Sequence, residues 1–488
     1  MTIRAVAPSP QTGRRSGATV RAALRRGVRH RQWQRRTADL LETVAVVSLV
    51  AIVAVFLRDG GSADLLSGDT ATVLTACGRL TGLVVVDLLL LQFLLAARVP
   101  WIDRAYGIDR ALKAHRVLGR ISLPLVLIHM ETLVLAYAVQ AHLSPWLGWA
   151  VEPFRMLSEV PDMLTAFAGT VLIVAVAVTS VRIARRRMSY ERWHLVHLTA
   201  YAAVGLSIPH QLSIGSDLTR NGAVKAYWIA LYVLVAASVV WWRILVPTIR
   251  TLWHGMRVES VTEELPGTWS VRITGRNLDR LPARSGQFLG WRFLSRGLWT
   301  TAHPWSLSSM PDGRHLRITV RDLGDHSRLL ADLQPGTRVA VEGPYGAFTT
   351  AVRTHHRVLL VAAGIGVTPV RAVLEELVRH HTAAPGHVTV IVRVDDVDLI
   401  PLREELEHLT SVGGHQLHLL AGPPVAGSWL PSDLPGGDDA ARVRELVPDL
   451  YLHDVYVCGP PPWMTLVHHS LRKAGLRRGQ VHDERFGW

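Results

Sequence analysis

Six long apolar runs constrain the fold of this chain more than any other feature of its sequence. Each run approaches the ~20 residues that a helix needs to cross the hydrocarbon core of a bilayer. Backbone inside lipid must satisfy its own hydrogen bonds, so continuously apolar runs of this length are expected to be helices. We therefore predict a six-helix transmembrane bundle within 40–250, with spans at roughly 40–57, 73–97, 116–138, 163–181, 195–212 and 224–246.

The basic residues indicate how the bundle is oriented. A net charge of +14 would also suit a nucleic-acid-binding protein. Here, however, Arg and Lys gather beside the apolar runs, in 98–114, in 182–193 and after 246, while the alternate loops are poorer in them. The positive-inside rule then predicts a multi-pass protein of the cell membrane, with both termini cytoplasmic and no nucleic-acid partner.

The first 37 residues are polar and basic. They predict a disordered cytoplasmic tail over 1–37. A signal peptide is not expected, because the first apolar run begins too late and is long enough to span.

Four histidines lie inside two of the apolar runs, where ionisable side chains usually mark function. His115 and His129 lie in the third run, and His197 and His210 lie in the fifth. Both runs pass from inside to outside, so depth pairs His115 with His197 and His129 with His210. Imidazole is a common haem ligand, and bis-imidazole ligation suits electron transfer. We predict that these histidines hold two stacked haems; the alternative is ordinary interface histidines near helix ends.

Helical phase supports this assignment only in part. The 14-residue spacing from His115 to His129 returns to within ~40° of one face, whereas the 13-residue spacing from His197 to His210 misses by ~140°. His194 is no better as a ligand, and Pro209 is a candidate bend that corrects the phase. Arg79, near the outer end of the second run, is expected either beside a haem propionate or small anion, or as a snorkelling side chain.

The third and fifth runs resemble the ferric reductase-type transmembrane domain, which ferric reductases and NADPH oxidases share. The stretches "HRVLGRISLPLVLIHM" and "SYERWHLVHLTAYAAVGLSIPHQL" carry the resemblance. It implies that the four histidines above ligate two b-type haems. The two cysteines of the chain, Cys77 and Cys458, are too few for a Cys-ligated iron–sulfur cluster, so any electron relay needs another cofactor.

From about 256 to 352, short alternating runs such as "TWSVRITG" and "HLRITVRD" predict a small antiparallel β-barrel. The stretch HPWS, with Gly-Gln-Phe before it and Gly-Asp-His-Ser after it, is similar to the FAD-binding domain of the ferredoxin–NADP reductase family. The resemblance implies that Ser306 contacts the isoalloxazine edge, that Trp305 covers flavin or ribose, and that His303 and Ser327 lie near the FAD phosphates. Further implied FAD-binding residues are Gln287, Phe288, Pro304, Arg321 and Gly324.

From 353 to 488, apolar strands alternate with helical stretches, which predicts an α/β doubly wound parallel sheet. "RVLLVAA" runs into Gly364 and Gly366, then Thr368 and Pro369, and then an amphipathic helix. This strand, glycine turn and helix predict a pyrophosphate site for NADPH or NADH. Arg393 would pair with a 2′-phosphate, but Asp395 and Asp396 would instead suit a free ribose hydroxyl, so NADPH is favoured only slightly.

The last strand ends in Cys458, Gly459 and Pro460. A similar turn in the ferredoxin–NADP reductase family lies beside the nicotinamide, which implies that Cys458 is near the hydride-transfer site; the alternative is a small buried residue at a strand end. The family commonly ends Glu-x-aromatic. Glu484 and Phe486 match this pattern, with Phe486 stacked on the flavin and Trp488 as its rival.

Together the three blocks predict one electron path, from cytoplasmic NAD(P)H through FAD and two haem b groups to an acceptor on the outer side. Ferric chelate reduction is the preferred activity. Reduction of oxygen to superoxide, or of a periplasmic or quinone-type partner, is the alternative. A different class of protein, a haem-binding sensor or transporter with a degenerate reductase tail, is disfavoured by the intact glycine turn and HPWS stretch.

Overall fold

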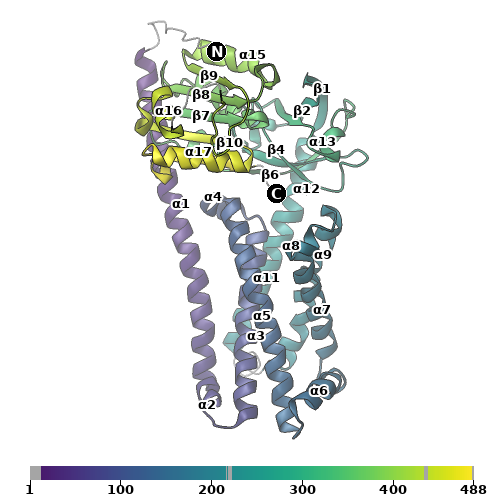
Figure 1. Cartoon of the computed structure of the whole chain (residues 1–488). Helices are drawn as coiled ribbons and strands as arrows, with labels where there is room; N and C mark the ends of the chain where they lie inside the picture. The colour runs from purple at the N-terminus through teal and green to yellow at the C-terminus, as the bar shows by residue number, and fades with distance from the viewer. Residues whose placement is uncertain (1–12, 216, 218–221, 433–437, 486–488) are drawn as a thin grey trace. The chain divides into compact units, whose positions relative to one another are not determined.

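The computed structural model describes residues 13–215, 217, 222–432 and 438–485 (Figure 1). The chain divides into two compact units. One is helical and comprises Arg36–Leu245. The other combines the residues up to Arg35 with those from Val246 onward. The two units are described separately below.

Long helices make up the first unit. Five helical segments are long and apolar enough to cross a membrane: Ala18–Leu65, Thr70–Ala96, Arg110–Gln140, Met163–Ser180 and Gly222–His254. The helices are α1 (Gly13–Phe56), α2 (Ser62–Leu65), α3 (Thr70–Ala96), α4 (Pro100–Tyr106), α5 (Ile108–Gln140), α6 (Pro145–Glu159), α7 (Met163–Ser180), α8 (Arg182–Arg185), α9 (Tyr190–Ser213) and α11 (Gly222–Val239). The part of α1 up to Arg35 and the helix α12 (Val246–His254) belong to the second unit. The sequence prediction of a membrane-spanning helical region is therefore confirmed with five candidate spans.

The fifth predicted span corresponds to α9, which is a helix of 24 residues. It is not among the five apolar segments. Its histidines, together with Pro209 and Gln211, make it more polar than the other long helices. Length and composition therefore establish five candidate spans and do not establish α9 as a further one.

Two regions differ from the sequence prediction. The tail expected to be disordered over 1–37 is helical from Gly13, where α1 begins, and its first twelve residues lie outside the described part of the chain. The expected loop 139–162 contains helix α6, whose Ser144 caps the first turn by accepting from Leu147 N. Trp146 is 87% exposed while Met156 is buried. Such a two-faced helix suits a membrane interface, and its prolines concealed it in the sequence.

The second unit begins with two three-stranded antiparallel sheets, ordered β1-β2-β5 and β4-β3-β6. Single bridges between Leu307 and Ile318 and between Arg257 and Arg338 link the two sheets. Alternate residues face inward, as Val271, Ile273 and Trp291 do, which follows from the two-residue period of a strand. The strands are β1 (Arg257–Leu265), β2 (Thr268–Thr274), β3 (Phe288–Phe293), β4 (His303–Ser306), β5 (His315–Arg321) and β6 (Val339–Tyr345), and the short helix α13 (Asp325–Arg328) lies between the last two.

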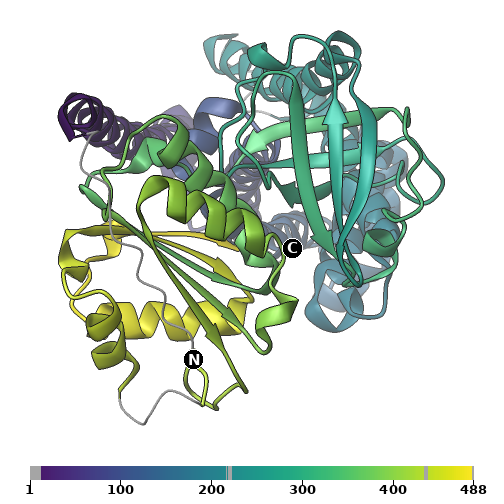
Figure 2. The same cartoon turned by 90° about the horizontal axis from the view of Figure 1, so that it is seen from above.

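The remainder is a five-stranded parallel sheet of order β11-β10-β7-β8-β9 with helices on both faces (Figure 2). Val358, Leu360 and Ala362 of β7 pack toward α14, whereas Leu359 and Val361 pack toward α17. The apolar runs of the sequence are thus buried on both sides, as parallel sheets require. The elements are β7 (Arg357–Ala363), α14 (Val367–Arg379), β8 (Val388–Val394), α15 (Arg403–Gly413), β9 (Gln416–Ala421), α16 (Asp439–Leu446), β10 (His453–Gly459), α17 (Pro461–Lys473) and β11 (Val481–Arg485).

The strand order locates the ligand-binding edge. The chain goes from β7 outward to β8 and β9, then returns to place β10 on the other side of β7. In open α/β sheets, ligands bind beyond the carboxyl ends of strands at such a reversal of order. The turns after β7 and β10 carry Gly364 and Gly459, so the predicted nucleotide-binding residues converge at this point. The prediction of an α/β nucleotide-binding fold is confirmed.

Buried histidines give this domain a defined response to acid. Burial lowers the pKa of His415 to about 4, and nearby His387 and Arg353 add to the effect. Between pH ~6.5 and pH ~4, His415 is protonated in the unfolded chain but stays neutral in the folded chain. The free energy of unfolding should therefore fall by about 1.4 kcal/mol per pH unit over this range. His415→Leu should flatten thermal unfolding midpoints measured between pH 7.5 and 5. Equal acid sensitivity in the variant would contradict this assignment.

Candidate functional site

The four predicted haem histidines lie on two pairs of packed helices in the helical unit. His115 and His129 are on α5, which packs on α3, and His197 is on α9, which packs on α7. His129 Nδ1 lies 2.7 Å from the carbonyl oxygen of Gly78. His115 Nδ1 lies 3.3 Å from that of Gln92. A carbonyl only accepts, so in the neutral rings Nδ1 carries the proton and Nε2 presents its lone pair, the arrangement of a metal-binding imidazole.

The structure brings together the pairs that depth predicted. The ring centroids of His115 and His197 are 6.0 Å apart, with 66° between the ring planes. Metal–imidazole bonds are about 2 Å long, so two imidazoles on one iron face each other across roughly 4 Å between nitrogens, with centroids somewhat further apart. His210 lies within electrostatic reach of His129. Both α9 candidates stack on an aromatic ring, His194 on Tyr190 at 5.7 Å and His197 on Trp193 at 4.9 Å, so only the approach of His197 to His115 supports His197 as the candidate ligand.

Two glycines on α3 allow the close approach of α5. A Cβ on Gly82 would lie 2.8 Å from the His129 ring, and one on Gly78 would lie 2.7 Å from Leu133. These residues form a Gly-x-x-x-Gly pattern, which lets helix backbones approach in membranes. This pattern is visible in the sequence and is a signal for close packing of α3 that the predictions above do not include.

The donor set suits a haem rather than a bare metal ion. Within the described residues, no group of three or more His, Cys, Asp or Glu side chains is arranged to hold a metal ion. Two facing imidazoles would hold a haem iron, whose other ligands would come from the porphyrin. The residues present therefore fit the group that the sequence implied.

Arg79 forms ion pairs with two aspartates of the helical unit. Its expected place beside a haem propionate or a small anion stays a prediction. Its guanidinium makes two hydrogen bonds with Asp217, at 2.9 and 2.5 Å, and one with Asp64 at 2.8 Å. It also lies 5.3 Å from the centre of the Phe56 ring. The structure thus gives Arg79 a role in joining segments of the helical unit.

The HPWS stretch forms strand β4 and pairs with β3, so that Ser306 faces Phe288. Ser306 is 4% exposed, and its hydroxyl has no partner in the structure. A buried hydroxyl without a partner is costly and points to a missing ligand. Trp305 stacks on His303 at 5.0 Å with 17° between the rings, and Trp291 Nε1 donates to the Trp305 carbonyl at 2.8 Å. Pro304, between them, pairs with Gly290. These features fit one edge of a flavin.

The other predicted FAD residues shape backbone turns. The Gln287 amide donates to Gly346 O at 3.2 Å and accepts from Arg284 N at 2.9 Å. Ser327 Oγ donates to Gly324 O at 2.8 Å and accepts from Leu323 N at 2.9 Å. These bonds preform the turn that the sequence assigned to the pyrophosphate. Arg321, at the end of β5, is exposed beside that turn.

The glycine turn after β7 packs against the end of β10. A Cβ on Gly366 would lie 2.2 Å from the carbonyl oxygen of Cys458, so only glycine fits. Thr368 and Pro369 are buried, and the Thr368 hydroxyl donates to Ile365 O at 3.0 Å. These two residues hold the turn and do not face solvent. Pro460 caps helix α17, which starts beyond the turn.

Three of the four residues predicted to be catalytic, Ser306, Cys458 and Glu484, are connected by a series of strand pairings and close contacts. Cys458 pairs with Glu484 across β10 and β11. A Cβ on Gly346 would lie 2.9 Å from Glu484 Oε2 and 3.3 Å from the Phe288 ring, and Phe288 pairs with Ser306. The flavin-binding and nucleotide-binding segments therefore meet here. Phe486 and its rival Trp488 lie outside the described residues.

Cys458 is not a nucleophile in this setting. Burial raises the pKa of its thiol well above the usual range, and the carboxylates of Glu484 and Asp483 add to the effect. The side chain is fully buried. A protonated thiol here supplies shape and excludes water, which is compatible with a neighbouring nicotinamide.

Arg393 does not settle the choice between NADPH and NADH. Its side chain is 6% exposed, donates to Val394 O, and lies 3.6 Å from Asp395. The guanidinium is thus engaged within its own strand end rather than presented to a 2′-phosphate.

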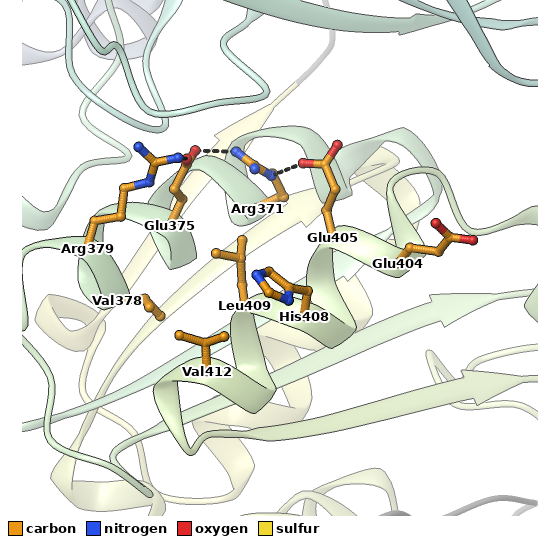
Figure 3. Close-up of a pocket in the computed structure, with 9 residues that line it drawn as sticks. All are labelled: Arg371, Glu375, Val378, Arg379, Glu404, Glu405, His408, Leu409 and Val412. Carbon is orange, nitrogen blue, oxygen red and sulfur yellow. Dashed lines mark hydrogen bonds and ion pairs between the residues drawn. The ribbon is translucent and has the colours of Figure 1, made fainter.

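A hollow of about 420 Å³ lies between α14 and α15 (Figure 3). Four of its charged residues, Arg371, Arg379, Glu375 and Glu405, form ion pairs with one another. Arg371 lies between Glu375 and Glu405, 2.6 Å from the latter. Arg317 of β5 makes two hydrogen bonds with Glu405, at 2.7 and 2.9 Å. Burial alone would raise the pKa of Glu405, but the bonds from Arg317 and the charge of Arg371 lower it. This network joins the β-sheet domain to the parallel-sheet domain and contains none of the predicted cofactor residues.

Comparisons with known proteins agree with this division. A family model described as the ferric reductase like transmembrane component matches 81–208, and one described as the oxidoreductase NAD-binding domain matches 360–469. The ferredoxin reductase component of 3-ketosteroid-9-alpha-monooxygenase from Rhodococcus rhodochrous is 30% identical over 48% of this chain and 66% of its own length. NADH oxidoreductase HCR of Escherichia coli is 28% identical over 48% of this chain and 68% of its own.

Solved structures cover the same segment. The FAD/NAD-binding domain of a nitric oxide dioxygenase from Vibrio cholerae matches 48% of this chain and 99% of its own, at 22% identity and a TM-score of 0.40. The chain spans about two thirds of the curated relatives that it matches.

The fold and the matches define a membrane protein with an NAD-binding oxidoreductase module. More narrowly, the chain joins a ferric reductase-like transmembrane component to a ferredoxin–NADP reductase-like module, the architecture of ferric reductases and NADPH oxidases. The sequence prediction of that architecture, and of an NAD(P)H-dependent oxidoreductase module, is confirmed.

Two glycines predicted to contact phosphates should respond differently to a methyl group. Gly366→Ala meets the backbone of Cys458 and should cost at least about 2 kcal/mol of stability. Gly324 has extended backbone with nothing within 4 Å of a Cβ, so Gly324→Ala should stay within about 0.5 kcal/mol of wild type. Thermal unfolding and FAD titration check both. If Gly324 lies against the FAD phosphates, the added methyl group should weaken FAD binding. Unchanged FAD affinity in Gly324→Ala would contradict the placement of this turn in the flavin site.

Proposed function

We propose that this chain is a transmembrane oxidoreductase that moves electrons from cytoplasmic NAD(P)H through FAD and two b-type haems to an acceptor on the outer side. The observation that carries the proposal is the pair of α5 histidines tied through Nδ1 to α3 carbonyls, in the same chain as an oxidoreductase NAD-binding domain. Imidazoles held this way suit iron, and an NAD(P)H-fed flavin needs a one-electron outlet.

The proposal includes finer features of the fold. Helix α9 acts as a sixth span, since it carries two of the four histidines despite its lower hydropathy. The two small sheets form one closed antiparallel barrel, an interpretation supported by the single bridges at Leu307 and Arg257. Both termini lie in the cytoplasm, which is supported by the Arg-rich loops 98–114 and 182–193.

Each part of the chain has a task in this scheme. The α3 carbonyls hold Nδ1 of His115 and His129, which would leave Nε2 of each ring to hold a haem. Ser306 offers its hydroxyl to the flavin edge. Glu484 and the protonated Cys458 border the nicotinamide and exclude water. When bound, FAD converts a two-electron donor into one-electron steps, and haem iron carries one electron at a time.

Ferric chelates are the proposed acceptor. Two histidines holding each haem would leave the iron no open position for direct binding of oxygen. The ion pairs of Arg79 with Asp64 and Asp217 also remove a cation that would have held a small anion such as superoxide. Oxygen reduction at a haem edge is the alternative activity.

The acceptor can be decided with purified protein supplied with NADPH or NADH. We expect Fe(II) to form from a ferric chelate at a rate that superoxide dismutase does not change. Fe(II) production that superoxide dismutase abolishes would instead identify an oxidase, because iron would then be reduced by released superoxide. A preparation without FAD should be inactive with both acceptors.

The haem assignment predicts a separation of modules. His210→Ala should remove the outer haem, seen as loss of about half of the b-type absorbance after dithionite reduction. The variant should keep anaerobic reduction of FAD by the nicotinamide cofactor, since the flavin lies elsewhere in the chain. His194→Ala, a matched change on the same helix, should keep both haems. Loss of FAD reduction in a folded His210→Ala protein would contradict the module assignment.

A further inference from the structure

The N-terminal part of α1 packs on the nucleotide-binding domain of the same unit. Val20, Leu24, Gly27 and Arg31 recur at spacings of four, three and four residues, which places them on one helical face. Val20 and Leu24 are buried, whereas Arg29 is exposed. The face is narrow and built for close contact: a Cβ on Gly27 would lie 1.7 Å from the Arg353 carbonyl oxygen.

Arg31 is the last residue of this face, and its guanidinium lies in a socket formed by Val352, Asp454, Gly479 and His482. Its Nε donates to Val352 O at 2.6 Å, one terminal nitrogen donates to Gly479 O, and the other lies 2.5 Å from Asp454 Oδ1. His482 Nε2 is 3.0 Å from the same guanidinium. All five N–H directions of an arginine are fixed in one plane, so a socket with acceptors on several sides selects this residue over lysine.

Asp454 is the buried charge of the socket. Its side chain is 0% exposed. Besides Arg31, it accepts from the backbone N–H groups of Thr354 and His355, each at 2.6 Å, and lies 3.1 Å from His482 Nε2. Burial alone would raise its pKa, but the bond from His482, the Thr354 N–H and the charge of Arg31 lower it overall. A buried carboxylate of this kind requires its partners.

Two of the four socket residues lie at or just before β11: His482 belongs to this strand, and Gly479 precedes its first residue by two positions. Asp454 lies on the neighbouring strand β10. Strand β11 lies at the edge of the sheet, so the backbone ladder with β10 holds it on one side. Two residues beyond His482 comes Glu484, which pairs with Cys458 and lies against Gly346. Movement of β11 therefore displaces a group at the junction of the flavin and nucleotide segments.

We propose that the N-terminal helix is a clamp on edge strand β11, and that Arg31 is a positioning residue that sets Glu484 beside the nicotinamide. The role of Glu484 rests on the function proposed above, whereas the clamp rests on contacts alone. The helix that carries Arg31 continues without interruption to Phe56, within the first apolar segment, so the clamp ties the C-terminal strand to a membrane helix.

Hydrogen–deuterium exchange in the full-length protein in lipid nanodiscs tests the clamp without any assay of activity. In Arg31→Ala, amides of 18–35 and 481–485 should exchange roughly ten- to a hundred-fold faster, as expected for loss of buried charge-assisted hydrogen bonds. Arg29→Ala, which removes an equal but exposed charge from the same helix, should match wild type. Wild-type exchange of 481–485 in Arg31→Ala would overturn the clamp.

A second variant guards against misfolding of the first. Gly27→Leu keeps Arg31 but drives the helix off the Arg353 carbonyl, and it should reproduce the faster exchange in both segments. If Gly27→Leu exchanged as wild type does, the clamp would be overturned. Arg31→Lys should give an intermediate rate, because a single ammonium reaches Asp454 but not all of the other acceptors.

The positioning role is tested by anaerobic stopped-flow reduction of FAD in the same variants. Arg31→Ala should slow flavin reduction about ten-fold at saturating NADPH or NADH, since misplacing a reacting geometry affects the rate more than binding. Faster exchange with an unchanged rate of flavin reduction would overturn the positioning role. Should wild-type FAD resist both cofactors, the proposed function fails, and the exchange data still decide on the clamp.

Discussion

The close approach of α3 to α5 at Gly78 and Gly82 is the constraint on which the chemistry of the helical unit depends. A helix normally uses its carbonyls internally, but each oxygen retains a second lone pair. Because neither glycine has a Cβ, the His129 ring comes within 2.7 Å of the Gly78 carbonyl and takes up that lone pair. This hydrogen bond favours the tautomer of His129 that carries its proton on Nδ1, and it fixes the orientation of the ring. The direction and the basicity of the Nε2 lone pair are therefore set by one contact.

The nucleotide end of the chain depends on the same kind of contact. Gly366 lies against the backbone of Cys458, and Gly346 lies against the carboxylate of Glu484. Each glycine lets two segments that are distant in sequence meet where a methyl group would separate them. Because β7 and β10 are adjacent and parallel, both close approaches fall at the carboxyl edge of the sheet, where ligands bind in folds of this type.

Much of this could be predicted from the sequence, because period and composition carry it. Long apolar runs predicted the membrane helices, and continuously apolar strands predicted the parallel sheet. Two histidines in each of two runs predicted how those histidines pair. The structure adds a 6.0 Å approach of His197 to His115, which supports the preference for His197 over His194. The Gly78-x-x-x-Gly82 pattern was visible as well and would have indicated which helix carries the partners of α5.

What could not be predicted depends on partners far away in the chain. Arg79 pairs with Asp217, 138 residues on, and nothing local distinguishes a neutralised arginine from an anion site. The N-terminal segment is basic enough to suggest a disordered tail, yet its narrow stripe of Val20, Leu24 and Gly27 gains a partner only once Arg353 is folded nearby. Local composition describes a segment in water, whereas tertiary contact decides whether it is ordered.

The residues around Asp454 are held in place by the nucleotide-binding domain itself, and not by the N-terminal helix that carries Arg31. Asp454 keeps two backbone N–H donors, those of Thr354 and His355, when Arg31 is absent, and His482 Nε2 stays 3.1 Å from its carboxylate. The carboxylate is therefore preorganised by the domain itself, and the arginine completes the site without creating it. A buried charge that is mostly compensated in advance can accept and release a final partner at modest free energy, unlike one whose only partner is removed. Loss of Arg31 is therefore expected to cost less stability than loss of the sole partner of a buried charge would.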